Sequence, residues 1–140
     1  MKVHFIGIGG IGVSALAKYY LKMGHKVSGS DLVSSEITDA LKKLGAKVFT
    51  PHQNPAGEQV PYGAGKFGTG QVGHSEKNLP KDANLVIYSP AVPADNPELK
   101  KARKLGIKYQ SYPEALGELT KKYFTIAVSG THGKSTTTAM

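Results

Sequence analysis

A short pattern occurs three times in the 140-residue chain and restricts its fold more than any other feature. An apolar residue is followed by glycine and then by a strand-like run, as in Leu44-Gly45-Ala46-Lys47-Val48, and related stretches surround Gly24 and Gly106. Glycine at these positions suits the left-handed conformation that commonly ends an α-helix. Repeated helix-to-strand turns favour an α/β chain whose strands lie parallel in one sheet.

Strand-like and helix-like segments alternate between these turns. We predict strands at Val3–Ile8, Lys26–Gly29, Ala46–Phe49, Asn84–Ser89, Lys108–Gln110 and Phe124–Val128. Helices are predicted over residues 11–23, after a cap at Ser34 or Ser35, after the Asn96-Pro97 cap, and over Pro113–Lys121. The apolar spacing of the two middle helices places Leu44 and Leu105 with the residues of the buried face.

Residues 51–73 interrupt the alternation with six glycines and three prolines and show neither a strand nor a helix period. Such a composition is typical of a loop, which could be a surface excursion or could fold over a ligand.

Charge and composition exclude several classes of protein. The chain carries 18 Lys and Arg against 10 Asp and Glu, a net charge of +8, which suits an anionic partner. The lysine runs fall on polar faces of predicted helices, and no aromatic-interleaved basic stripe suggests nucleic acid. No apolar run approaches the roughly 20 residues of a membrane span, and the chain has no cysteine. We expect a cytoplasmic protein without nucleic-acid or membrane partners.

The first chemical signal is Gly7-Ile8-Gly9-Gly10-Ile11-Gly12, which follows a predicted strand and opens a predicted helix. This G-x-G-x-x-G pattern lets a pyrophosphate approach a helix N-terminus. Asp31 follows the second strand, where a carboxylate can meet a ribose hydroxyl. Together these features indicate a Rossmann-like, doubly wound parallel sheet that binds a nucleotide.

The second signal is the glycine-rich stretch from Gly130 to Thr136, which follows the last predicted strand. Backbone N–H groups of such a loop cradle phosphates, while its lysine and hydroxyl group serve the terminal phosphates and Mg²⁺. The spelling departs from the common phosphate loop, because Val128 stands where the first glycine is usual.

These motifs together, with Gly29-Ser30-Asp31 and Ser89-Pro90-Ala91-Val92, closely resemble the Mur ligases. The histidine within the phosphate loop and the double glycine near the N-terminus point to the member that joins L-alanine to UDP-N-acetylmuramate in peptidoglycan synthesis. The resemblance covers nearly all of the chain except 51–73, and it resumes at His74-Ser75-Glu76-Lys77-Asn78-Leu79.

The resemblance implies two sets of site residues. The UDP-sugar would be bound by Gly9, Gly10, Ile11, Gly12, Asp31, His74, Ser89 and Ala91, with His74 a candidate contact of the uridine. ATP would be bound by Gly130, Thr131, His132, Gly133, Lys134, Ser135 and Thr136. Lys134 would be catalytic by stabilising the transferring phosphoryl group, and Ser135 would ligate Mg²⁺.

The resemblance also implies an ATP-dependent, amide-forming ligase in which ATP phosphorylates the muramoyl carboxylate and the amine of L-alanine attacks the acyl phosphate. Residues 1–122 would form the UDP-sugar domain and 123–140 the start of an ATP-binding domain, an N-terminal fragment that we expect to be inactive alone. Two alternatives stay open from the residues themselves. One is the NAD-binding domain of an oxidoreductase, and the other is a nucleotide-binding module without chemistry.

Overall fold

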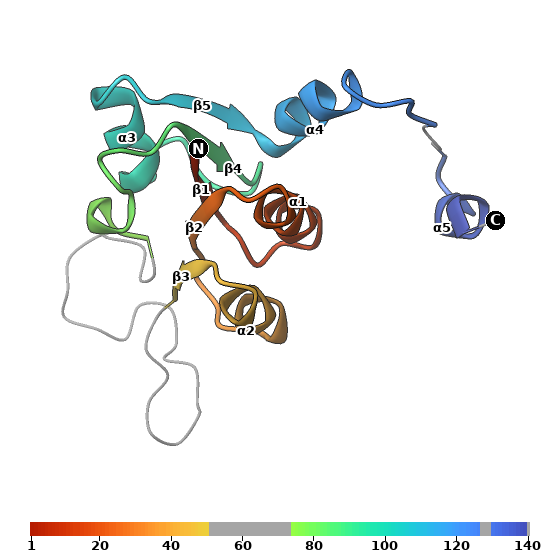
Figure 1. Cartoon of the computed structure of the whole chain (residues 1–140), viewed down its shortest axis with the longest axis horizontal. Helices are drawn as coiled ribbons and strands as arrows, with labels where there is room; N and C mark the ends of the chain where they lie inside the picture. Colours follow the sequence, from red (N-terminus) through yellow and green to blue (C-terminus); the bar gives the residue numbers. More distant parts are fainter. Residues whose placement is uncertain (51–73, 127–129, 140) are drawn as a thin grey trace.

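A computed structural model describes residues 1–50, 74–126 and 130–139, and its centre is a five-stranded parallel sheet. The strands are β1 (Lys2–Ile6), β2 (Lys26–Ser30), β3 (Lys47–Phe49), β4 (Leu85–Tyr88) and β5 (Lys108–Ser111). Their order across the sheet is β3-β2-β1-β4-β5 (Figure 1). The predicted α/β, doubly wound parallel fold is therefore confirmed, while the loop predicted for 51–73 lies outside the described residues.

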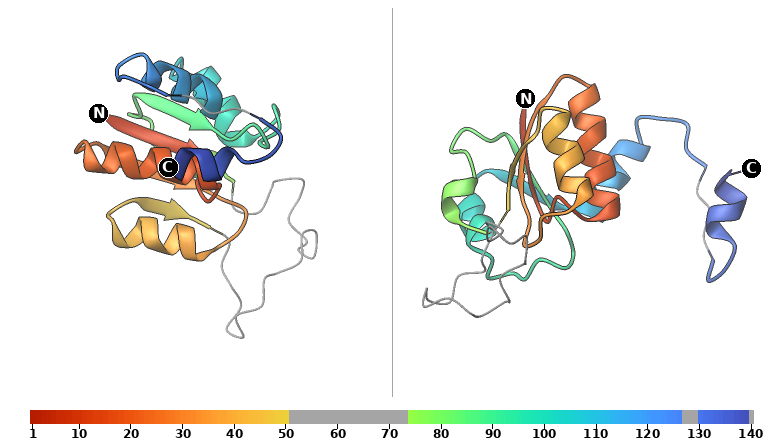
Figure 2. Two further views of the ribbon diagram at one scale, coloured as in Figure 1. Left: turned by 90° about the vertical axis from the view of Figure 1, so that its right-hand side faces the viewer. Right: turned by 90° about the horizontal axis from the view of Figure 1, so that it is seen from below.

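Helices cover both faces of the sheet. They are α1 (Ile11–Lys22), α2 (Glu36–Lys43), α3 (Pro97–Lys104) and α4 (Tyr112–Thr120), and a further helix, α5 (Lys134–Ala139), lies near the end of the chain. Helices α1, α2 and α4 lie on one face, and α3 lies on the other with the 3₁₀ turn η1 (Glu76–Asn78) (Figures 1 and 2). Within the described ranges, no helix is both long and apolar enough to cross a bilayer.

The alternation of side chains along β1 divides the core into two layers. Val3 and Phe5 join the buried cluster beneath α1, α2 and α4. His4 and Ile6 point the other way, because successive strand residues face opposite sides, and Ile6 joins the smaller cluster beneath α3 with Leu99. Both faces of the central strands are therefore buried, as the continuously apolar run in β4 predicts.

The helix-to-strand turns have the predicted conformation. Gly24, Gly45 and Gly106 have φ of 78°, 98° and 67°, values that L residues other than glycine rarely adopt. A Cβ atom at any of the three would meet nothing within 4 Å, so backbone conformation and not space requires the glycine. The structure also selects Ser35 as the N-cap of α2, where its side chain accepts from the N–H of Thr38.

Two parts of the sequence prediction are wrong. Leu44 and Leu105 are 58% and 46% exposed and not buried, since each is the C-cap residue where the chain leaves its helix. The strand predicted at Phe124–Val128 is absent over residues 124–126, and the rest of it lies outside the described residues. Phe124 and Ile126 are 95% and 80% exposed, so the apolar run that suggested a strand has no layer to pack against in the described part of the chain.

Gly29 provides a test of how closely the first two strands and the glycine turn approach one another. A Cβ atom there would lie 2.6 Å from Ile8 Cδ1 and 2.7 Å from the carbonyl oxygen of Phe5. Because the backbone oxygen cannot move aside, Gly29→Ala should lower the free energy of unfolding by about 1–3 kcal/mol. Urea denaturation measures the loss.

The matched control is Gly117→Ala within α4, where a Cβ atom meets nothing within 4 Å. Alanine is the better helix former, so this variant should be unchanged or up to about 1 kcal/mol more stable. Equal stability of the Gly29 and Gly117 variants would contradict the close approach.

Candidate functional site

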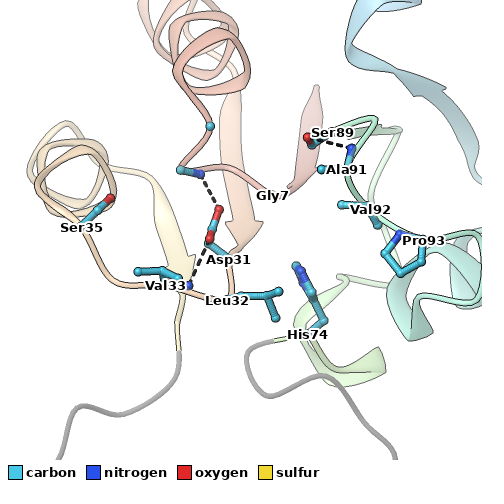
Figure 3. A pocket seen from close by; sticks show the side chains of 12 residues that line it. Gly7, Asp31, Leu32, Val33, Ser35, His74, Ser89, Ala91, Val92 and Pro93 are labelled. Atoms are coloured by element: carbon cyan, nitrogen blue, oxygen red, sulfur yellow. Dashed lines mark hydrogen bonds between the residues drawn. The ribbon is translucent and has the colours of Figure 1, made fainter. Parts of the chain in front are cut away.

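A cavity of about 350 Å³ opens at the carboxyl ends of β1, β2 and β4. The order of the strands reverses between β1 and β4, and open α/β sheets bind ligands at such a switch point. The lining residues come from the turns that follow these strands and from the segment at residue 74 (Figure 3): Gly7, Gly9, Gly10, Asp31, Leu32, Val33, Ser35, His74, Ser89, Ala91, Val92 and Pro93.

The glycine turn after β1 is held in place by backbone hydrogen bonds. The N–H groups of Gly7 and Ile8 donate to the carbonyl oxygen of Ser30 at 2.8 and 3.0 Å. Gly7 has a φ of 79°, and a Cβ atom there would lie 3.0 Å from Ser89 Cβ. Glycine at position 7 is therefore required by the fold itself.

Gly10 differs from Gly7 because nothing in the described fold requires glycine there. Its φ of −63° and ψ of 142° are accessible to any residue. The nearest atom to a Cβ at this position is the carbonyl oxygen of Gly7 at 3.5 Å, an ordinary van der Waals distance. Gly10 lines the cavity. The space left by its missing side chain is therefore open to a ligand and is not needed by neighbouring protein atoms.

The first turn of α1 lies next to Gly10 at the edge of the cavity. Gly10 is the N-cap of this helix and has no side chain that could accept from the N–H groups of the first turn. Ile11 is 85% exposed. A Cβ atom at Gly12 would lie 2.6 Å from Cζ of Tyr112. The backbone N–H groups at the start of α1 can therefore bind an anion, while glycine at position 12 also allows α1 to pack against Tyr112 of α4.

Asp31 ties the glycine turn to the segment after β2. Its Oδ2 accepts from the N–H of Gly9 at 2.8 Å, and its Oδ1 accepts from the N–H of Val33 at 3.1 Å (Figure 3). Each carboxylate oxygen keeps acceptor capacity for a hydroxyl group of a ligand. Asp31 thus lines the cavity in an orientation that is already fixed.

The remaining predicted UDP-sugar residues lie on the opposite wall. Ser89 and Ala91 follow β4, and the hydroxyl oxygen of Ser89 accepts from the N–H of Ala91 at 3.3 Å. His74 is buried at the floor of the cavity and reaches toward it in Figure 3. Six of the eight predicted residues therefore line one cavity, while Ile11 and Gly12 lie just beyond it at the start of α1.

Behind the cavity, Glu98 of α3 forms a buried hydrogen-bond network that sequence reasoning missed. Its carboxylate is 0% exposed and accepts from five groups. Oε2 accepts from His4 Nε2 at 2.7 Å and from the Ser30 hydroxyl at 2.9 Å. Oε1 accepts from His74 Nδ1 at 3.3 Å, from Ser75 N at 3.1 Å and from Asn78 Nδ2 at 3.2 Å.

The network keeps Glu98 ionised. Burial alone would raise the pKa of this carboxyl, but the hydrogen bonds from His4, His74 and Ser30 outweigh it and lower the pKa from 4.5 to about 2. The position of Glu98 in the first turn of α3 also favours a negative charge. The sequence did contain a signal for this network. Glu98 lies four residues before the buried Ala102 and so on the same face of the helix, and His4 stands inside an apolar strand.

The predicted ATP loop lies at the far end of the chain from this cavity. Gly130 and Gly133 have positive φ, and α5 begins at Lys134. The Lys134 ammonium donates to the carbonyl oxygen of Gly130 at 2.5 Å, which closes the turn. The exposed Thr131, His132 and Thr136 complete the described part of the loop. Figures 1 and 2 show α5 apart from the sheet.

Comparison with known proteins shows the class to which this fold and site belong. Residues 2–124 match the model of the Mur ligase family, catalytic domain, so the chain belongs to the Mur ligase family. Over 139 residues it is 50% identical to a UDP-N-acetylmuramate–L-alanine ligase of Acetivibrio thermocellus, covering 99% of this chain and 25% of that protein. The same-named ligase of Clostridium perfringens is 44% identical over 140 residues, covering 99% of this chain and 26% of the relative.

A solved structure supports the same relationship. The UDP-N-acetylmuramate–alanine ligase of Thermotoga maritima superposes with a TM-score of 0.76 at 37% identity, covering 99% of this chain and 27% of that one. The chain therefore spans about a quarter of the length of the relatives that it matches.

The Glu98 network predicts how stability depends on pH. The unfolded chain protonates this carboxyl near the ordinary pKa of 4.5, whereas the folded protein does so only near 2. The unfolded state therefore binds more protons between these values, and stability should fall as the pH drops through this window. Glu98→Gln should flatten this part of the curve and, because buried donors lose a charged acceptor, cost about 3–5 kcal/mol at neutral pH.

Urea denaturation at about pH 7 and about pH 3 measures both effects. Glu76→Gln, at an exposed position on η1, controls for the loss of one carboxylate. If the Glu98 variant retains the acid-side slope of the parent chain, another group is responsible for it.

Proposed function

We propose that this chain forms the UDP-sugar site of a UDP-N-acetylmuramate–L-alanine ligase. The observation that carries the proposal is Gly10, which the fold leaves free to be any residue and which lies where a ligand phosphate would approach the start of α1. The identity to ligases of that name, up to 50% over nearly the whole chain, supports the choice of ligand.

The geometry of the cavity supports a division of the nucleotide among its walls. The pyrophosphate suits the N–H groups at the start of α1, because a helix N-terminus favours anions. Asp31 is fixed by Gly9 and Val33 and can accept from a ribose hydroxyl. The base and the sugar would share the remaining wall, where Leu32, Val92 and Pro93 offer apolar contact and His74 offers a ring nitrogen.

The second half of the proposal concerns ATP and the whole ligase. The loop from Gly130 to Thr136 has the glycine conformations and the lysine that suit the phosphates of ATP, and Ser135 follows that lysine as a ligand for Mg²⁺. In the described part of the chain, no three His, Asp or Glu side chains gather to hold a metal, so Mg²⁺ would need further ligands. Bound Mg²⁺ would neutralise phosphate charge, and Lys134 would hold the phosphoryl oxygens.

The boundary between the two domains falls near Tyr123, after which Phe124 and Ile126 are exposed.

Ligand choice tests the proposal against a dinucleotide-binding alternative. UDP-N-acetylmuramate should bind this chain at least about tenfold more tightly than NAD, a difference of about 1.4 kcal/mol. Titration calorimetry measures both affinities. Equal or tighter binding of NAD would overturn the proposed site.

Gly10→Ala should separate binding from folding. The added methyl group fits the described protein without a close contact, so the melting temperature should stay within about two degrees of the parent value. It would crowd the pyrophosphate, and UDP-N-acetylmuramate should bind at least about tenfold more weakly. The control, Gly117→Ala, lies in α4, away from the cavity, and should bind UDP-N-acetylmuramate with the affinity of the parent chain, with a melting temperature that is unchanged or higher. Parent-like affinity in the Gly10 variant would show that no ligand phosphate approaches this glycine, which would contradict the proposed site.

Activity is expected only of a chain as long as the relatives. Given ATP, UDP-N-acetylmuramate and L-alanine, such a chain should release phosphate, and Lys134→Ala should reduce the rate by at least about a thousandfold. Lys122→Ala, at an exposed lysine outside the loop, should leave the rate unchanged. The 140-residue chain should release no phosphate, and substrate-dependent release by it would contradict the two-domain proposal.

A further inference from the structure

His74 is the one residue that both lines the cavity and belongs to the Glu98 network within the described ranges. Its Nδ1 lies 2.8 Å from the Ser30 hydroxyl oxygen and 3.3 Å from Glu98 Oε1. Figure 3 shows the ring reaching into the cavity between Leu32 and Pro93. Nδ1 of His74 therefore contacts the protein, while the ring lines the cavity.

The hydrogen bonds of the network determine where His74 carries its proton. Glu98 is ionised and can only accept, so the single Ser30 hydroxyl proton points to Oε2 at 2.9 Å. The Ser30 oxygen must then accept from His74, which requires a proton on Nδ1. If the Ser30 hydroxyl donated to an unprotonated Nδ1 instead, two close contacts would lack a proton. The Ser30 oxygen would face Glu98 Oε2 without one, and Nδ1 would face Glu98 Oε1 without one.

The position of the proton on Nδ1 fixes the character of the other ring nitrogen. In a neutral imidazole one nitrogen donates and the other accepts. Nε2 lies across Cε1 from Nδ1, on the side of the ring turned away from Ser30. A neutral His74 therefore offers Nε2 as an acceptor on its ligand side.

His4 is the second histidine that contacts Glu98. Its Nε2 donates to Glu98 at 2.7 Å, and its Nδ1 lies 2.8 Å from the Ser28 hydroxyl oxygen. His4, Ser28 and Ser30 all face α3, because β1 and β2 pair in register and alternate residues share a face. The network thus has a histidine partner for Glu98 at a point away from the cavity.

We propose that Ser30, oriented by Glu98, is a positioning residue that holds His74 in its Nδ1–H tautomer, so that Nε2 selects a nucleobase edge bearing an N–H group. The inference rests on the proposed UDP-sugar site and names its base specificity. Uracil presents an N–H between two carbonyl groups, whereas cytosine presents a bare ring nitrogen at the same position. Cytosine would therefore leave two acceptors facing each other, an unpaired arrangement that a polar site strongly disfavours.

The tautomer can be measured directly on the parent chain. Long-range ¹H–¹⁵N spectra at about pH 8, above the ordinary pKa of histidine, distinguish a protonated Nδ1 from a protonated Nε2. The His74 signals should show the proton on Nδ1. A proton on Nε2, or on both nitrogens at this pH, would overturn the inference without any variant.

Base selectivity tests the consequence with a matched pair of variants. Equilibrium dialysis should show UDP binding at least about tenfold more tightly than CDP to the parent chain. Ser30→Ala should reduce this ratio to about threefold or less and shift the His74 signals toward a mixture of tautomers. Ser28→Ala makes the same change two positions earlier on β2, at the residue that contacts His4 and not His74, and should keep both the ratio and the spectrum.

The outcomes separate this inference from the proposed function. If the parent chain binds neither UDP nor UDP-N-acetylmuramate, the proposed function fails, and this inference fails with it. If UDP binds but CDP binds equally well, or if Ser30→Ala keeps the parent ratio, the UDP site stands and the role of Ser30 is wrong. Should Ser30→Ala fail to fold, the parent spectrum and the parent UDP-to-CDP ratio still decide.

Discussion

The buried negative charge of Glu98 is the interaction on which the rest of this structure depends. Its oxygens receive hydrogen bonds from β1, from β2 and from the segment that enters η1. These parts are far apart in the sequence, and each contributes a wall or a support of the cavity. A buried charge without partners would cost several kcal/mol, so the network fixes the positions of its members relative to one another.

The charge of Glu98 contributes both to the folding of the protein and to the geometry of the cavity. Leu99 and Ala102 pack α3 onto the sheet through apolar contact, which has no directional preference. Glu98 adds direction, because its donors must come from particular atoms at particular angles. The same directional preference extends to His74, which contacts Glu98 and lines the cavity.

Much of the fold could be predicted from the sequence because its signals are local. The glycine turns, the Asn96 cap and the apolar β4 run each act within a few residues and are present as predicted, and of the two cap candidates Ser34 and Ser35 the structure has Ser35. The two failures also have local causes. Leu44 and Leu105 follow the helix period but stand one residue past the last turn, and the apolar side chains of Phe124 and Ile126 are exposed in the described chain.

The candidate site was predictable only in part, for a related reason. Gly9, Gly10, Asp31, Ser89 and Ala91 follow strands, and the ends of parallel strands meet at one edge of a sheet. The Glu98 network joins residues separated by up to 94 positions, and no periodicity reveals which polar side chains will meet across layers. Whether Gly10 is required by the fold or left open for a ligand likewise needed the distance to its neighbours.

The hydrogen bonds from Gly9 and Val33 to Asp31 have a consequence for the kinetics of binding. Both carboxylate oxygens are held by backbone N–H groups of the protein itself, at 2.8 and 3.1 Å. A ligand that meets this part of the site does not have to order it first, so little conformational entropy is lost there on association. Association at this corner should be limited by diffusion and orientation and not by rearrangement. Differences in affinity among nucleotides that share a ribose should then arise mainly from how fast each one leaves.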